Sequence, residues 1–252
     1  DVSEETGQTI ISGMGELHLE VLKHRMERDF NLKVKVHKPR VSYRETVKKP
    51  VKGEGHFNRQ SSGTTQFAGV TVQLEPFEGE KAVTVVNKLK PGDLPPNLLD
   101  ALLQTLKDQA DGGGVVGYPL MKVKITLLDV DYREGETTDV AIQAAGSHAF
   151  REALNQAIDD KSIALLEPVM RLEVVTPEEF LGNIQGDLNK RRAHIINSER
   201  RGDLCVLEAE VALSQMFGYS NESRGLSQGR ASYSMEPLKY DEAPAEVLEG
   251  MM

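Results

Sequence analysis

The 252-residue chain has 39% hydrophobic residues, which is typical of a globular protein, and its length predicts two or three domains. Its formal net charge of -9 argues against indiscriminate nucleic-acid binding, because such affinity comes mainly from neutralising phosphates. Any RNA contact therefore has to use local basic clusters. No apolar run approaches the roughly 18 residues that a membrane helix needs. A single cysteine, Cys205, excludes an internal disulfide and a cysteine-based zinc site and favours a reducing, cytoplasmic compartment.

Residues 1–46 show the pattern of a strand, a helix and a second strand. The acidic, polar start at 1–9 is expected to be the interior of a longer protein, and a short strand at 9–11 is followed by a glycine turn at 13–15. Four apolar residues then recur at helical spacing: Leu19, Leu22, Met26 and Phe30. The alternation at 32–36 predicts a half-buried strand. Two strands cannot cover the apolar face of this helix. We therefore expect half a domain, a partial ferredoxin-like βαβ piece.

Residues 47–165 alternate between strand and helix patterns. The segment 48–53 has the composition of a linker, and strands are expected at 70–74, 82–86 and 123–127. A helix with a broad leucine stripe is expected to begin at Pro95–Pro96, and an alanine-rich helix is expected at 140–158. The pattern predicts an α/β module.

Residues 166–240 follow the order β-α-β-β-α-β, which predicts a ferredoxin-like module. The run from Thr176 to Glu179 reads as a capping box, with Pro177 in the first turn of a helix. Strands are expected at 172–174, 194–197, 204–211 and 231–235, with a charged hairpin turn at 200–203 and a short helix at 220–226. The acidic tail, 241–252, is expected to fray. The fold class is thus mixed α+β and α/β, with several domains.

No catalytic, cofactor-binding or metal-binding constellation is found in the sequence. Gly112, Gly114 and Gly117 match a dinucleotide fingerprint by letter, but they follow a helix and lead into a strand, the reverse of what that site needs. A phosphate-binding loop is absent from the sequence. The histidines do not cluster, and the acidic pairs lie at expected helix ends, where the helix dipole explains them. We therefore expect a protein that binds rather than catalyses.

Three local groups are candidates for contact with RNA. One is basic and lies at an expected helix end and hairpin turn: Lys190, Arg191, Arg192, Arg200 and Arg201. These residues form one positive patch if the helix end and the turn come together; otherwise they are ordinary charges at a helix end and a turn. The other two groups are polar loops at 59–66 and 132–139, whose hydroxyl and amide groups suit hydrogen bonding to sugar and phosphate. Solvated loops between strands are the alternative reading.

Several runs of the sequence resemble the C-terminal half of bacterial elongation factor G, a translational GTPase that moves tRNA and mRNA on the ribosome. They occur in the family's order and span most of the chain: Ile11–Glu20, Lys38–Thr46, Leu166–Pro168, Gly186–Arg192 and Met216–Tyr219. The resemblance implies that 1–46 is the C-terminal half of domain III, that 47–165 is domain IV, and that 166–240 is the ferredoxin-like domain V. Domain IV would be an elongated module with a ribosomal-protein-like βα crossover fold that reaches the decoding centre.

The resemblance also implies partners and site residues. The partners would be the ribosome, through its rRNA and ribosomal proteins, and tRNA and mRNA at the decoding centre, with the factor acting as a cytoplasmic monomer away from membranes. GTP and magnesium would be bound by an N-terminal domain that this sequence lacks. The basic group named above would contact RNA from domain V. The domain IV tip would contact it through Arg59, Gln60, Ser61, Gly63, Gln66, Tyr132, Arg133 and Glu134.

The tip departs from the family pattern in both loops. Ser62, Thr64 and Thr65 differ from the usual letters of the first loop, and Thr64 replaces a cation. In the second loop Arg133 stands where the family has histidine. We expect Arg133 to be the main cation of the tip. Three hypotheses remain: tRNA–mRNA translocation, ribosome recycling by a paralogue with the same architecture, and a plain protein-interaction module.

Overall fold

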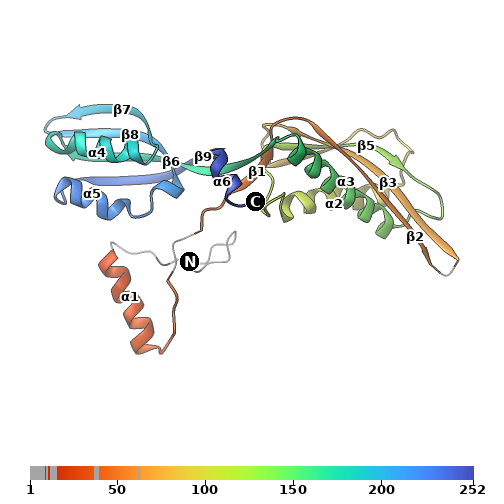
Figure 1. The fold of residues 1–252 in the computed structure, drawn as a ribbon, viewed down its shortest axis with the longest axis horizontal. Coiled ribbons are helices and arrows are strands. Elements are labelled where there is room, and N and C mark those ends of the chain that lie inside the picture. Colours follow the sequence, from red (N-terminus) through yellow and green to blue (C-terminus); the bar gives the residue numbers. More distant parts are fainter. Residues whose placement is uncertain (1–8, 10, 12–15, 37–39, 62) are drawn as a thin grey trace. The chain divides into compact units, whose positions relative to one another are not determined.

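A computed structural model describes residues 9, 11, 16–36, 40–61 and 63–252. The chain divides into two compact units (Figure 1). The first unit comprises residues 43–166 with 242–252, and the second comprises residues 1–42 with 167–241. Within the described ranges, no helix is long and apolar enough to span a membrane.

A four-stranded sheet with two helices on one face forms most of the first unit. In spatial order, its strands are β2 (Val51–Ser61), β3 (Thr64–Pro76), β5 (Val123–Asp131) and β4 (Val83–Asn87). β2, β3 and β5 are antiparallel neighbours, whereas β4 and β5 are parallel and are joined through helix α2 (Pro96–Gly112). This βαβ connection is the expected crossover, and the predicted α/β class is confirmed. Helix α3 (Asp139–Asp159) follows β5.

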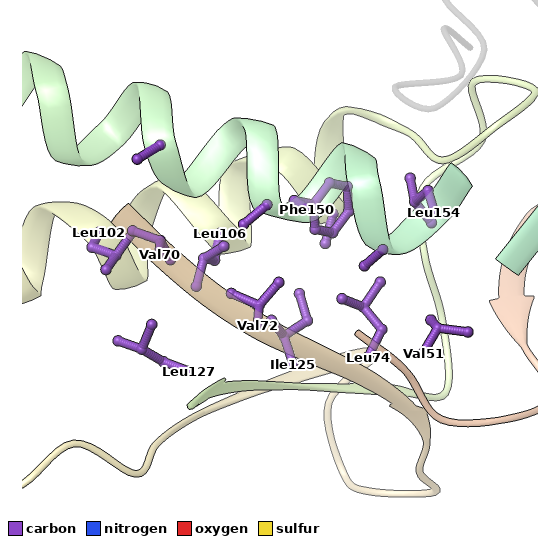
Figure 2. Packing of buried hydrophobic residues seen from close by; sticks show 14 of the residues in the cluster. Val51, Val70, Val72, Leu74, Leu102, Leu106, Ile125, Leu127, Phe150 and Leu154 are labelled. Carbon is purple, nitrogen blue, oxygen red and sulfur yellow. The ribbon is translucent and has the colours of Figure 1, made fainter. Parts of the chain in front are cut away.

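The core of the first unit lies between the sheet and the two helices. Figure 2 shows Val70, Val72 and Leu74 of β3 facing Leu106 of α2 and Phe150 of α3. All five side chains are buried. Their alternation along β3 is the period-2 pattern of a strand with one buried face, and the leucine stripe of α2 covers that face.

The predicted linker at 48–53 is wrong, because β2 begins at Val51 and packs tightly on α3. A Cβ atom on Gly53 or Gly55 would overlap backbone atoms of Ala145, Ala149 and Ala153. Glycine in a strand is often found where another backbone approaches closely. The composition that resembles a linker is therefore what allows α3 to lie directly against β2.

Glu45 anchors the glycine-rich loop that follows α2. It lies in the short strand β1 (Arg44–Val47), and its fully buried carboxylate accepts hydrogen bonds from backbone N–H groups of Val115 (2.6 Å), Val116 (3.1 Å) and Tyr118 (2.9 Å). A Cβ on Gly114 would overlap this carboxylate. Gly114, one of the three glycines that match the dinucleotide fingerprint by letter, thus makes room for the Glu45 carboxyl. Burial raises the pKa of the Glu45 carboxyl, and the N–H bonds offset this only in part.

Residues 167–241 form a ferredoxin-like sheet, as predicted. Their strands take the order β9-β6-β8-β7, and the chain order is β6-α4-β7-β8-α5-β9. The elements are β6 (Ile163–Pro177), α4 (Glu178–Lys190), β7 (His194–Arg201), β8 (Leu204–Ala212), α5 (Tyr219–Ser227) and β9 (Ser232–Glu242), with a 3-10 turn at Leu213–Gln215. Residues 163–166 of β6 belong to the first unit, where they pair with β1.

Two local predictions in this part of the chain are wrong. The Thr176 side chain does not cap α4; its hydroxyl donates to the Pro177 carbonyl at 3.4 Å, because β6 remains extended through Pro177. The acidic tail does not simply fray either. Residues to Glu242 belong to β9, and a short helix, α6 (Ala245–Glu249), follows, with Leu248 packed against the core of the first unit.

Helix α1 (Glu16–Asp29) confirms the predicted helix near the start of the chain. The strand predicted at 32–36 is not formed. A lone strand leaves its backbone groups without partners, and the described part of the chain pairs no strand with this segment. Phe30 and Val36 are 68% and 69% exposed. Most of the predicted strand at 9–11 and the turn at 13–15 lie outside the described residues.

Candidate nucleic-acid interface

The first polar loop predicted from sequence is the end of a long β-hairpin. β2 and β3 stay paired in register from Val51 opposite Leu74 to Ser61 opposite Thr64. The third strand, β5, pairs with β3 only as far as Gly69. The hairpin tip, residues 57–67, is therefore a two-stranded ribbon that continues beyond the sheet (Figure 1). Ser62 lies outside the described residues, and Gly63 has a φ of +83°, a conformation that glycine adopts easily.

Arg59 is the only charged residue of the hairpin tip. It lies in β2 opposite Gln66, and it is exposed. Among the described residues, no carboxylate forms an ion pair with its guanidinium. Gln60 is also exposed, and Gln66 is half-buried. The tip therefore presents one cation among amide and hydroxyl groups, a composition suited to hydrogen bonding with an RNA backbone.

The second polar loop is docked onto the base of the tip. Its Thr137 hydroxyl donates to the Phe67 carbonyl at 2.7 Å and accepts from the backbone N–H of Arg133 at 2.9 Å. The backbone N–H of Phe67 in turn donates to the Glu136 carbonyl at 3.1 Å. Thr138 then caps α3 by accepting from the Ala141 N–H. The loop is thus a structured connection between β5 and α3.

Arg133 has partners within the protein, although half of its side chain remains exposed. Its guanidinium carbon lies 3.6 Å from the centre of the Phe67 ring. Its terminal nitrogens lie 3.7 Å from an oxygen of Asp131 and 3.6 Å from an oxygen of Glu136. Two carboxylates therefore offset its charge. Tyr132, its neighbour, packs partly against the core, whereas Glu134 is exposed.

The basic residues of the second unit do not form one patch. Lys190 is the last residue of α4, whereas Arg200 of β7 contacts Glu178, the first residue of that helix, at 2.9 Å. A 13-residue helix is about 18 Å long from first to last residue, at 1.5 Å per residue. Of the two readings that the sequence left open, the helix end and the hairpin turn therefore lie apart, as separate groups of charges.

Most of these cations also have internal partners. Arg192 lies 3.8 Å from Glu167, and Arg201 lies 3.1 Å from Glu199. Arg191 has the strongest internal contacts. Only 17% of its side chain is exposed, and its guanidinium donates to Asp187 at 2.8 Å and to the Gln215 carbonyl at 2.6 Å. Lys190 alone in this group has no ion pair with another described residue.

Sequence reasoning missed two residues that organise these surfaces. Phe67 carries the docking of the second loop, and Tyr219 lies under Arg191, 5.2 Å from its guanidinium carbon. Tyr219 is fully buried, and its hydroxyl has no hydrogen-bond partner within the described part of the chain. Burial raises the pKa of Tyr219 to about 12, with a further contribution from the charge of Asp187. The sequence signals for them were an isolated Phe directly after a polar loop and a Tyr after the run Met-Phe-Gly.

Comparison with known proteins places the whole chain in one family. Models of elongation factor G match in succession: domain III at residues 1–38, domain IV at 39–158 and the C-terminus at 164–251. Elongation factor G of Fervidobacterium nodosum is 45% identical over 251 residues, a match that covers 100% of this chain and 36% of the relative. The chain thus spans about a third of that relative's length.

A solved structure extends the likeness to three dimensions. The crystal structure of a Thermus thermophilus protein matches with a TM-score of 0.86 and 33% identity, covering 100% of this chain and 37% of that one. Three consecutive domain models, a full-length alignment at 45% identity and the shared fold agree. The chain belongs to the elongation factor G family, and the models that match it in succession are those of domain III, domain IV and the C-terminus.

Proposed function

We propose that the chain is the ribosome-binding portion of a translational GTPase that promotes tRNA–mRNA translocation. The observation that carries the proposal is its 45% identity to an elongation factor G over the chain's whole length. GTP would be bound and hydrolysed elsewhere in the longer protein, with magnesium. The part described by this chain would act mechanically, by placing the hairpin tip where tRNA has been.

The chemistry of the tip supports a contact that forms and is then released. Each phosphate that a protein neutralises releases counterions and steepens the dependence of binding on salt. A strongly cationic tip would hold RNA tightly. Here the tip offers one exposed cation, Arg59, among amides and hydroxyls. Such a surface can bind sugar and phosphate by hydrogen bonds at modest electrostatic cost.

The second unit would supply a separate contact with ribosomal RNA. Lys190 and Arg192 lie at one end of α4, and Arg200 and Arg201 lie at the other. We assign the contact to these exposed residues and exclude Arg191, whose guanidinium is occupied within the protein.

Two activities of the intact factor test this proposal. Single-turnover translocation and ribosome splitting with a recycling factor should be measured on one preparation at one salt concentration. We expect translocation to be accelerated in the presence of GTP. Splitting without translocation would replace the proposal with a recycling role, and failure to co-sediment with ribosomes at low salt would leave only a protein-interaction module.

A further inference from the structure

Phe67 is the point at which the second polar loop is fastened to the hairpin. Its backbone N–H, its carbonyl and its ring each contact a different residue of the loop: Glu136, Thr137 and Arg133. Phe67 is 8% exposed, yet it does not belong to the core cluster of the first unit. Its burial is therefore local, and the Arg133 guanidinium covers the ring.

Arg59 and Phe67 face opposite sides of the hairpin. Phe67 pairs with Asn58, and the next pair along is Arg59 with Gln66. Successive pairs in an antiparallel ribbon point to opposite faces. The face shared by Arg59 is the one that carries Gly53 and Gly55, against which α3 packs. The two arginines thus belong to different surfaces of the tip.

Arg133 also forms an ion pair with a carboxylate of its own loop. The Oε2 atom of Glu136 is buried without a hydrogen-bond partner, and its ion pair with Arg133 is 3.6 Å long. Because the side chains of Arg133 and Glu136 are 50% and 39% exposed, water screens this ion pair, and it contributes at most about 1 kcal/mol. Asp131, on the other side of the guanidinium, lies in β5 opposite Gly69. Arg133 therefore ties the loop, β5 and the hairpin together.

The hairpin tip needs such a fastening. As strands, residues 57–67 pair only with one another in the described structure, because β5 reaches no farther than Gly69. Their other support comes from Phe57, which packs against the core, and from the loop bonded to Phe67. An isolated two-stranded ribbon is marginally stable in water. The turn at Gly63 lies four residues beyond Phe67, about 13 Å at 3.3 Å per residue. A small change in the direction of the hairpin at Phe67 would therefore move the turn at Gly63 farther than it moves Phe67 itself.

We propose that Arg133 is a positioning residue that clamps the 132–138 loop onto Phe67 and so directs the hairpin, while the electrostatic contact of the tip with RNA is made by Arg59. The second half of this inference rests on the proposed function. The clamp itself rests only on contacts within the chain.

Hydrogen exchange in the 252-residue chain tests the clamp without a ribosome. Arg133→Ala and Phe67→Leu should each speed exchange of the amides at 58–66 by roughly two- to fivefold, the range of a cation–π contact at an exposed site. The double variant should be no faster than the faster single variant, because both remove one interaction. Arg133→Lys should fall between the wild type and Arg133→Ala, and Arg151→Ala, at an exposed site in α3, should change nothing. Unchanged exchange in Arg133→Ala, or additive effects, would overturn the clamp.

Ribosome binding by the intact factor then separates positioning from contact. The slope of log affinity against log salt should fall by about 1 in Arg59→Ala and should be unchanged in Arg133→Ala. Arg133→Ala should still slow single-turnover translocation. A slope that falls in Arg133→Ala would make it an RNA contact and overturn the assignment. If neither slope changes, the RNA contact of the tip is refuted, while the exchange experiment still decides the clamp.

Discussion

Gly55 of β2 lies directly against Ala145 of α3, so closely that a Cβ on the glycine would overlap the Ala145 carbonyl. The overlap is with backbone, which cannot rotate away as a side chain can. We therefore expect Gly55→Ala to lower the free energy of unfolding by about 3 kcal/mol, the upper end of the usual cost of overpacking. Chemical denaturation measures it. Gly182→Ala in α4 is the matched control, because its site is open and alanine favours a helix by roughly 0.5–1 kcal/mol. Equal effects of the two substitutions would contradict this packing.

Burial of Glu45 should stabilise the chain more at low pH than at high pH, the opposite of ordinary acid denaturation. Burial raises the pKa of Glu45 in the folded chain, so the folded state binds a proton more readily than the unfolded state does. The contribution of Glu45 to stability therefore falls as pH rises through the folded pKa. The stability gap between wild type and Glu45→Gln should therefore be larger at about pH 4 than at about pH 8.

The same variant also tests the hydrogen bonds of Glu45. The amide nitrogen of a glutamine cannot accept as the second carboxylate oxygen does, so Glu45→Gln should cost about 1–3 kcal/mol of unfolding free energy where the carboxyl is ionised. Denaturant titrations at several pH values give both quantities. If the stability gap between wild type and Glu45→Gln widened with rising pH, the backbone N–H groups would lower the pKa of Glu45 by more than burial raises it.

Tyr219 carries a buried hydroxyl without a partner among the described residues. We expect Tyr219→Phe to leave the unfolding free energy unchanged or to raise it by up to about 1 kcal/mol, because an unsatisfied polar group is removed and the ring remains. The wild type should also lose stability between its ordinary pKa of 10.0 and the folded value of about 12, whereas the variant should not. A clear destabilisation by Tyr219→Phe would show that the hydroxyl has a partner.

Lys190 and Arg191 are neighbouring cations with opposite expected roles. Arg191→Ala should lower the unfolding free energy by about 1.5–3 kcal/mol, because it breaks hydrogen bonds to Asp187 and the Gln215 carbonyl that involve a charged group. Lys190→Ala should leave stability within about 0.5 kcal/mol, as for an exposed site. In ribosome binding we expect the larger effect from Lys190→Ala, whose affinity should depend less steeply on salt than that of the wild type. Thermal unfolding and binding on the same two variants check the pair.

Much of the fold could be predicted from the sequence, because its elements carry regular apolar patterns. The leucine stripe of α2, the alternation in β3 and the βαββαβ order of the second unit all appear as expected. The start of β2 could not be predicted this way. Gly53 and Gly55 supply no apolar side chain, since their role is to let the backbone of α3 approach.

Residue type indicates which side chains can bind RNA, but it does not reveal which partners they have in the fold. Arg133 looks like a free cation in the sequence, and its stacking on Phe67, distant along the chain, depends on the fold. The separation of Lys190 from Arg200 could have been inferred, because the two basic groups flank opposite ends of the predicted helix α4. Helix length alone excludes a single patch.

The central claim is that the hairpin tip contacts RNA during translocation, and Arg59→Ala in the intact factor tests it most directly. Single-turnover translocation should be measured together with the salt dependence of ribosome binding. Lys52→Ala is the matched control, because Lys52 is an exposed lysine on the same strand near the base of the hairpin. We expect Arg59→Ala to translocate more slowly, with a salt slope reduced by about 1, and Lys52→Ala to match the wild type. A translocation rate and slope unchanged by Arg59→Ala would contradict the account.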